Sequence, residues 1–303
     1  MGAPSTLSEI KPFLFRLFSD RDLINFGVPA FLQKPLAYLI ATFRAPKVKP
    51  QYEAIGGGSP LVRYSIEQGE LLSKALEMPV FVGMLYSEPL LKEVAQEILN
   101  QGFERVYHIT LYPQYSVATA GACLRDGRRY LGGRVELKEV KSWATNPKYI
   151  EWIRKGIREE LKGASPEDTL ILFSAHSLPK YVVEEKGDTY PKEVEATVKR
   201  VMEAFPEFNY EVGYQSRVGP IEWLEPTTEE VLKRAKEKGY KRVVVFPVSF
   251  VSEHIETLYE LDREYGEVAE ELGLDYRRVK LNHRDELLIE AMRDEVLKLK
   301  EGS

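Results

Sequence analysis

The sequence is poor in the residues that build disulfide frameworks and thiolate metal clusters. Its 303 residues include one cysteine, Cys123, which excludes an internal disulfide and a cluster of several thiolate ligands. A single cysteine is also typical of a reducing compartment, so we expect a cytoplasmic location. The length favours two domains over one, each large enough for its own core.

Long apolar runs and a strong charge of one sign are missing as well. No run approaches the roughly 20 apolar residues of a transmembrane helix, and the first residues lack the pattern of a signal peptide. The most apolar stretch, residues 28–43, is interrupted by Lys34 and Pro35. It is either a helix packed on the core or an apolar lip that touches a membrane peripherally or rims a pocket. The net charge of −5, with acids and bases interspersed, gives no indication of a nucleic-acid partner.

What the sequence does contain is an alternation of strand-like and helical patterns. Continuous apolar runs occupy Met78–Tyr86, Arg105–Pro113, Thr169–Ala175 and Arg242–Phe250. Helical patterns occupy residues 88–100, 147–161, 191–204 and 228–238. Apolar runs of this kind are typical of parallel strands buried on both faces, so we predict an α/β fold with parallel sheets flanked by helices.

A faint repeat predicts two similar halves. Residues 101–116 and 238–252 share a glycine, an aromatic residue, a charged residue, Arg-Val, a strand and a proline, followed by aromatic and serine residues. We therefore expect an N-terminal half over residues 1–143 and a C-terminal half over residues 144–303. A last helix over 285–300 is a candidate for packing back on the first half.

One of the four histidines stands where a ligand site is expected. Ligands of open α/β sheets bind outside the carboxyl ends of the strands, and His176 follows the apolar run that ends at Ala175. A neutral imidazole there accepts protons near neutral pH or binds a transition metal. The alternative is a histidine whose ring is satisfied by the backbone of a tight Ser-Leu-Pro turn.

Acidic residues follow the last of the four apolar runs. If a helix begins near Ser252, then Glu256, Glu260 and Glu264 recur every four residues and form an acidic stripe, which suits the approach of a hydrated divalent cation. An ordinary solvated face is the alternative, and a helix that starts at Thr257 with a capping box to Glu260 would weaken the stripe. Imidazole with carboxylate suits Fe²⁺ or Zn²⁺ better than Mg²⁺.

A glycine-rich segment, Gly56–Pro60, precedes another helical pattern. Its main-chain N–H groups would suit an anion such as a carboxylate. A tight turn without a ligand is an equally good interpretation.

Several longer segments around these residues resemble the signature series of ferrochelatases. They are FSAHSLP (Phe173–Pro179), GDTYP (Gly187–Pro191), YQSRVGPIEWLEP (Tyr214–Pro226) and FVSEHIETLYELDREY (Phe250–Tyr265), with further matches at Phe13–Ile24, Tyr52–Leu61 and Leu111–Gly121. The resemblance covers nearly the whole chain, in order.

The resemblance implies insertion of Fe²⁺ into protoporphyrin IX, which forms protohaem and releases two protons in haem biosynthesis, a lyase reaction. It implies two Rossmann-like domains with the active-site cleft between them. It also implies that Fe²⁺ is a substrate and that the enzyme has no prosthetic group. The cysteines that bind an iron–sulfur cluster in some relatives are absent, so we expect no cluster. Both a monomer and a homodimer are compatible with the sequence.

The resemblance also assigns roles to individual residues. His176 and Glu256 correspond to the catalytic and metal-binding pair. Secondary positions on the metal path are Glu253, His254, Glu260 and Glu264. Porphyrin-binding positions are Arg44, Tyr52 and Ser59 near the propionates, with Tyr115 and Trp143 as flat walls for the ring. An Arg–carboxylate pair gives the propionate contact a physical basis, while a purely structural role is the alternative for all five.

Two departures from the family and two alternative functions stand beside this interpretation. Relatives usually begin with an apolar strand before the turn that appears here as MGAPST, so we expect the first strand to be absent from this sequence. Leu85 and Ser87 replace residues that many relatives have, which argues against a porphyrin contact there.

The alternative enzyme inserts iron into coproporphyrin III, or cobalt or iron into a related tetrapyrrole. The alternative of another class is a non-catalytic carrier of haem or porphyrin.

Overall fold

The computed structural model describes residues 1–24, 26–219 and 221–302. Pro220, in the family-like segment 214–226, and Ser303, at the end of the expected second half, lie outside the described residues. The chain divides into two compact units. Unit 1 comprises Met1–Leu111, Val117–Lys141 and Met292–Ser303, and unit 2 comprises Tyr112–Ser116 and Ser142–Ala291. The expected boundary after residue 143 stays a prediction about domains.

Unit 2 is built on a four-stranded parallel sheet in the order β4-β3-β5-β6. Its strands are β3 (Thr169–His176), β4 (Asn209–Gln215), β5 (Arg242–Pro247) and β6 (Asp275–Arg278). The predictions of strands at residues 169–175 and 242–250 are confirmed, the second with an earlier end. All of β3 before His176 is buried, as the continuous apolar run requires.

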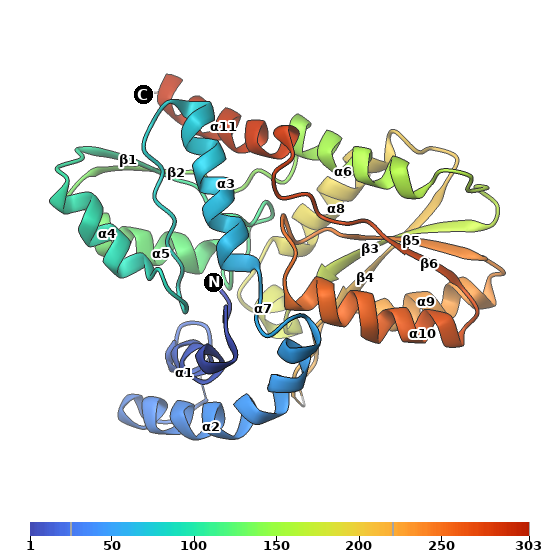
Figure 1. Ribbon diagram of the computed structural model, residues 1–303, viewed down its shortest axis with the longest axis horizontal. Helices are drawn as coiled ribbons and strands as arrows, with labels where there is room; N and C mark the ends of the chain where they lie inside the picture. Colours follow the sequence, from blue (N-terminus) through green and yellow to red (C-terminus); the bar gives the residue numbers. More distant parts are fainter. Residues whose placement is uncertain (25, 220, 303) are drawn as a thin grey trace. The chain divides into compact units, whose positions relative to one another are not determined.

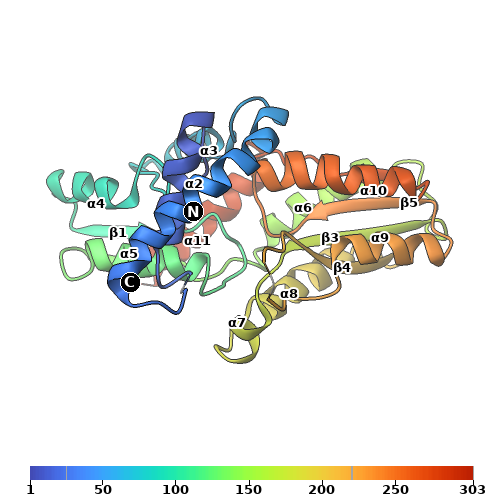
Figure 2. The same cartoon turned by 90° about the horizontal axis from the view of Figure 1, so that it is seen from below.

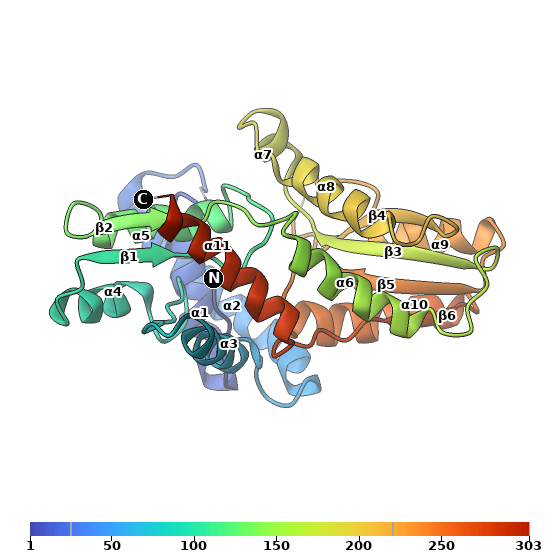
Figure 3. The ribbon, with the colours of Figure 1, turned by 90° about the horizontal axis from the view of Figure 1, so that it is seen from above.

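Helices cover both faces of this sheet. α6 (Pro147–Glu160) and α8 (Tyr190–Met202) lie over one face, and α9 (Thr228–Glu237) and α10 (Tyr265–Glu271) lie over the other (Figures 1, 2 and 3). The short α7 (Lys180–Glu184) follows β3. Two of these helices begin at a side-chain cap: the Asn146 side chain accepts from the first turn of α6, and Thr227 forms a capping box with Glu230 at α9.

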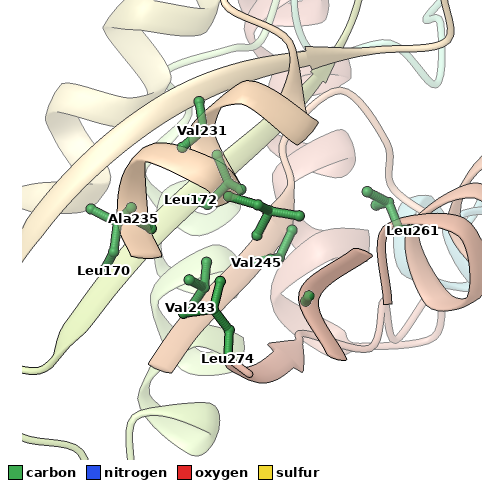
Figure 4. Close-up of a cluster of buried hydrophobic side chains, with 10 residues drawn as sticks. Leu170, Leu172, Val231, Ala235, Val243, Val245, Leu261 and Leu274 are labelled. Carbon is green, nitrogen blue, oxygen red and sulfur yellow. The ribbon is translucent and has the colours of Figure 1, made fainter. Parts of the chain in front are cut away.

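The core of unit 2 follows from the alternation of side chains along each strand. Alternate residues of β3 and β5 pack against α9 and the segment around α10 (Figure 4). The labelled side chains are Leu170, Leu172, Val231, Ala235, Val243, Val245, Leu261 and Leu274. On the opposite face, Phe246 of β5 packs edge-on against Trp152 of α6, with 5.8 Å between ring centroids.

Unit 1 contains a smaller sheet, in which β1 (Arg105–His108) pairs in parallel with β2 (Glu136–Glu139). α4 (Leu91–Asn100) and α5 (Ala120–Leu131) pack together beside it, around Val94, Ala95, Ile98 and Leu131. α3 (Leu61–Leu76) precedes this core. The predicted strand at Met78–Tyr86 is wrong: among the described residues, its one bridge joins Met84 to Leu90. An apolar run favours a strand, but a strand also needs a neighbour that accepts and donates its main-chain hydrogen bonds.

The chain begins with a short turn, η1 (Leu7–Glu9), and two helices that pack on each other, α1 (Ile10–Ser19) and α2 (Ala30–Ala54). The apolar stretch 28–43 is therefore helical from Ala30. α2 leaves large apolar side chains exposed, namely Phe31 (76%), Tyr38 (53%), Leu39 (53%) and Phe43 (69%). In the described part of the chain, no helix is long and apolar enough to cross a membrane.

The last helix, α11 (Glu286–Glu301), runs from residues assigned to unit 2 into residues assigned to unit 1. Within unit 1, Arg293 Nε donates to the main-chain oxygen of Ala75 at the end of α3, at 3.0 Å.

Candidate active site

His176 is the last residue of β3, at the carboxyl end of the sheet. Its main-chain N–H donates to Ser249 Oγ at 3.0 Å, which ties the strand end to the segment after β5. Its side chain is 32% exposed, and Nδ1 lies 3.1 Å from Glu256 Oε2. A carboxylate only accepts, so Nδ1 carries a proton and donates it to Glu256. The ring is thus held by a carboxylate, and the alternative of a ring satisfied by the backbone of the turn is wrong.

Glu256 opens the helical segment after β5, and the fold brings it to His176 from 80 residues away. Its side chain is 28% exposed, and the same Oε2 lies 3.5 Å from His254 Nε2. Burial by itself would raise the pKa of Glu256, but the imidazoles of His176 and His254 outweigh it and lower that pKa. Burial would lower the pKa of His176, but the charge and hydrogen bond of Glu256, helped by Glu260, raise it. The two sequence-predicted residues form one coupled pair.

His254 supports this pair from a buried position. Its Nδ1 lies 3.2 Å from the main-chain oxygen of Ser252, which only accepts, so Nδ1 carries a proton. The ring also packs against Phe250, with 4.3 Å between centroids. Nε2 is therefore the ring nitrogen that faces Glu256.

The segment that carries the acidic residues is η2 (Glu256–Glu264), a π-helix. The N–H of Tyr265 bonds to the oxygen of Glu260, five residues earlier, where an α-helix would reach back four. The three acids therefore lie on a π-helix, and the prediction that they form a stripe along an α-helix is wrong. The capping-box alternative is wrong, because Thr257 lies inside η2 and contacts Glu253 and the main chain of His254. π-helical turns occur often at functional sites.

The acids of η2 pass from partly buried to exposed. Glu256 and Glu260 are half-buried and Glu264 is exposed, and the route for a cation along them stays a prediction. Burial and the negative charge of Glu256 raise the pKa of Glu260, against hydrogen bonds from Ser216 that lower it. Burial, and to a lesser extent the charge of Glu267, raises the pKa of Glu264.

Glu253 differs from the other predicted path residues because a buried cation holds it. Arg278 Nη1 donates to both carboxylate oxygens at 2.7 and 3.0 Å, and the N–H of Leu281 donates at 2.8 Å. Arg278 also contacts Asp262, and its side chain is 2% exposed. Burial would raise the pKa of Asp262, but Arg278 outweighs it and lowers that pKa. Sequence reasoning missed Arg278, whose only signal was a charged residue at a strand end.

The five expected porphyrin contacts are divided between the units. In unit 1, the Arg44 guanidinium carbon lies 5.7 Å from the centroid of Phe18, Tyr52 is buried, and Ser59 Oγ accepts from the N–H of Leu61 at 3.3 Å. In unit 2, the N–H of Tyr115 donates to Glu193 at 2.7 Å. Trp143 packs edge-on against Tyr149, with 5.0 Å between centroids. Their contacts with a porphyrin stay predictions.

The glycine-rich segment after α2 is a tight turn. The N–H groups of Gly56 and Gly57 bond to the main chain of Glu53 and Tyr52, and that of Ser59 bonds to Pro4. These three donors are therefore used within the protein, and the anion-binding interpretation that relied on them is wrong. Gly58 is required by close approach, because a Cβ there would lie 2.0 Å from the oxygen of Ser5.

The side chains at this site do not form a closed metal-binding shell. In the part of the chain that the structure describes, no group of three or more His, Cys, Asp and Glu side chains is arranged to hold a metal. A structural zinc site closes its shell with four protein ligands. The His176–Glu256 pair offers two side chains, fewer than such a shell requires.

Comparisons with known proteins agree on one family. A family model described as Ferrochelatase matches residues 1–299. Curated proteins named ferrochelatase include those of Gloeobacter violaceus (41% identical over 98% of this chain and 94% of that protein) and Aquifex aeolicus (41% over 97% and 95%). A third, from Gloeothece citriformis, is 42% identical over 96% of this chain and 79% of that protein.

Solved structures show the same kind of fold at low sequence identity. SirB from Bacillus subtilis with Fe³⁺ matches with a TM-score of 0.60 and 13% identity, over 80% of this chain and 91% of that one. CbiX, described as the terminal enzyme for biosynthesis of sirohaem in denitrifying bacteria, matches with a TM-score of 0.53 and 9% identity, over 79% and 92%. These likenesses show a chelatase-type α/β fold, as the sequence predicts.

Proposed function

The chain belongs to the ferrochelatase family, with ferrochelatase function in haem biosynthesis, and we propose that it inserts Fe²⁺ into protoporphyrin IX as a lyase, forming protohaem and releasing two protons. The observation that supports this reaction most directly is the hydrogen bond between His176 and Glu256 at 3.1 Å. It joins a proton acceptor to a metal-binding carboxylate at the carboxyl end of a parallel sheet, where ligands of such folds bind.

His176 is the group that takes a pyrrole proton. Because Nδ1–H donates to Glu256, Nε2 is the nitrogen with a lone pair to offer, and the carboxylate stabilises the imidazolium that forms. The pKa of His176, raised by Glu256 against the effect of burial, strengthens it as a base. Each turnover moves two protons from the pyrrole nitrogens to solvent, the first through His176, as Fe²⁺ takes their place.

Glu256 and the other acids of η2 handle the incoming ion. The lowered pKa of Glu256 keeps its carboxylate ionised near neutral pH, and carboxylate with imidazole is a suitable donor set for Fe²⁺. Glu264 would receive the hydrated ion first, because it is exposed while Glu260 and Glu256 are both half-buried, and Glu260 would receive it next. Glu253, already held by Arg278, would act on this path by shaping the start of η2.

The propionates and the ring would be bound by the residues that the family resemblance singles out. Arg44 offers a charge-assisted hydrogen bond to a propionate. Tyr52 and Ser59 are proposed to lie near the propionates as well. Tyr115 and Trp143 are proposed ring contacts. These five assignments follow from the resemblance.

The exposed apolar side chains of α2 support a peripheral membrane contact through residues 28–43. Phe31 and Phe43 are the most exposed of them. Apolar side chains on a helix without a spanning length are typical of a protein that lies on a membrane. We propose a cytoplasmic enzyme, monomeric or homodimeric, that touches the membrane in this way and uses Fe²⁺ as substrate without a prosthetic group.

Anaerobic Fe²⁺ insertion, followed by absorbance, tests the proposal. Wild type, His176→Ala and the matched histidine control His283→Ala are compared with protoporphyrin IX and coproporphyrin III. We expect insertion into protoporphyrin IX by wild type and His283→Ala, and a loss of about 10²–10⁴-fold in His176→Ala, the usual contribution of a general base. Porphyrin binding, measured by fluorescence quenching, should be unchanged in that variant.

Three other outcomes would contradict parts of the proposal. Preference for coproporphyrin III would show that this porphyrin, and not protoporphyrin IX, is the substrate. Porphyrin binding without insertion by folded wild type would favour the carrier. Full activity of His176→Ala would remove this residue from the chemistry.

A further inference from the structure

The carboxylate of Glu260 is held by the end of β4. The N–H of Ser216 donates to Oε1 at 2.6 Å, Gln215 Nε2 donates to Oε2 at 3.2 Å, and the Ser216 hydroxyl also donates to Oε2. The Tyr265 hydroxyl of α10 also donates to Oε1, at 3.4 Å, and all four donors are neutral groups. We call Gln215 and Ser216, with their three donors, the Glu260 clamp.

The backbone of Ser216 indicates that its hydroxyl has a purpose. Its φ of 67° lies in the left-handed region, and Glu77 is the other non-glycine residue there in the described part of the chain. Glycine adopts this conformation without steric conflict, and serine does not. Strained positions of this kind cluster at functional sites, and here serine supplies a hydroxyl that glycine lacks.

Gln215 is fully buried and its amide has a determined orientation. Oε1 accepts from Ser174 Oγ at 2.7 Å, and Ser174 Oγ lies 2.8 Å from Thr228 Oγ1. Nε2 must therefore face η2, where it donates both to Glu260 and to the main-chain oxygen of Glu256 at 3.2 Å. One side chain thus ties together two acidic residues on neighbouring turns.

Electrostatics explains why Glu260 needs such a clamp. Glu256 and Glu260 are both carboxylates, and repulsion between them favours rotation of Glu260 toward water. An arginine would prevent that rotation but would also neutralise the charge that attracts a cation, as Arg278 does for Glu253. Neutral donors fix the position of Glu260 and leave its attraction for a divalent ion.

We propose that Gln215 and Ser216 are positioning residues for metal transfer, which hold the Glu260 carboxylate where it receives hydrated Fe²⁺ and passes it to Glu256. This inference rests on the proposed function. It assigns the clamp a role in handling the metal and none in binding the porphyrin.

The test begins with Ser216→Gly, which keeps the N–H donor and suits the positive φ but removes the hydroxyl. Glu77→Gly is the matched control, because Glu77, like Ser216, has a positive φ but lies in unit 1. In initial-rate assays we expect the KM for Fe²⁺ to rise about 10–100-fold in Ser216→Gly, the effect of losing one hydrogen bond to a charged group. The KM for porphyrin should stay within about twofold, as in the control. Gln215→Glu, which sets a third carboxylate against Glu260, should have a larger effect in the same direction.

A double-mutant cycle decides whether Ser216 acts through Glu260. In a Glu260→Ala background, Ser216→Gly should produce no further change in the KM for Fe²⁺. An unchanged KM in folded Ser216→Gly, or an equal rise in the Glu260→Ala background, would overturn the proposal. Binding of Co²⁺ to the porphyrin-free variants, followed by visible absorbance, supplies a readout that does not need turnover. A wild type that binds Co²⁺ but inserts no iron would refute the proposed function, while the cycle for Co²⁺ affinity would still decide the clamp.

Discussion

At the scale of single residues, function depends on partners that lie far away in the sequence. His176 became a candidate because it follows a buried strand, but its proton position and its raised pKa come from Glu256, 80 residues later. Glu253 and Glu260 look alike in the sequence, yet one is held by Arg278 and the other by neutral donors. The type of residue was readable, and the partner that decides its role was not.

The His176–Glu256 pair gives a titration prediction. In Glu256→Gln, the pKa of His176 should fall, because the carboxylate that outweighs burial is gone while burial remains. An NMR titration of the His176 ring in both proteins measures the difference. An unchanged or higher pKa in Glu256→Gln would contradict the coupling.

The same pair predicts a pH window for stability. The pKa of His176 is raised above 6.5, so its contribution is complete below about that pH and is lost as pH rises through the folded value. The pKa of Glu256 is lowered below 4.5, so its contribution is present above that pH and is lost as pH falls. The thermal midpoint of wild type should therefore exceed that of Glu256→Gln most between pH 4.5 and 6.5. A difference that grows steadily toward pH 8 would contradict this sign.

The buried Arg278 gives a stability prediction. Arg278→Met should lower the free energy of unfolding by about 3–5 kcal/mol, because it leaves the carboxylates of Glu253 and Asp262 without their buried cation. Its sequence neighbour Arg277, half-exposed and paired with Asp275, is the matched control, and Arg277→Met should leave that free energy nearly unchanged. Urea denaturation measures both, and equal effects would show that burial of Arg278 does not matter.

At the scale of elements, periodicity identified α6, α8, α9, β3 and β5 of unit 2, but it missed β4 and β6 and did not give the finer geometry. α6 and α9 lie almost where the sequence predicts, because Asn146 with Pro147 and the Thr227–Glu230 box mark their starts locally. η2 was expected as an α-helix, and the spacing of its acids does not distinguish four from five residues in each hydrogen-bonded turn. Met78–Tyr86 has the composition of a strand, but composition does not supply a pairing partner.

α2 carries a prediction for the element as a whole. Replacing Phe31 and Phe43, its two most exposed aromatic residues, by serine should reduce binding to lipid vesicles by about tenfold or more, since burial of each aromatic side chain is worth roughly 1.5–3 kcal/mol. Insertion activity measured without vesicles should be unchanged. Flotation with vesicles of phosphatidylcholine and phosphatidylglycerol measures the effect, and equal binding of the double variant would remove α2 from the contact.

At the scale of the whole molecule, the two units differ in how far they bury their strands. β3 and β5 each have two neighbouring strands and are buried almost throughout. β1 and β2 have one neighbour each among the described residues, and neither has a fully buried residue within its bounds. Regions with few buried contacts and exposed main-chain hydrogen bonds open more easily.

This contrast predicts different hydrogen-exchange protection in the two units. Amides of β3 and β5 should exchange slowest, near the limit set by global unfolding, and those of β1 and β2 should exchange faster by local opening. Native-state exchange followed by mass spectrometry measures both sheets in one experiment. Equal protection of the two sheets would show that unit 1 is stabilised by contacts other than its strand pairing.

The sequence by itself determined the α/β class, the buried strands β3 and β5, the family, and the placing of His176 after one buried strand and of Glu256 in the helical segment after another. These follow from composition, period and long motifs, which are local properties of the chain. Only the tertiary structure decided the hydrogen bond between that pair, the π-helical turn, the cation on Glu253 and the neutral clamp on Glu260. The three side-chain contacts depend on residues from separate elements meeting at the carboxyl end of the sheet, and no local pattern encodes which of them meet.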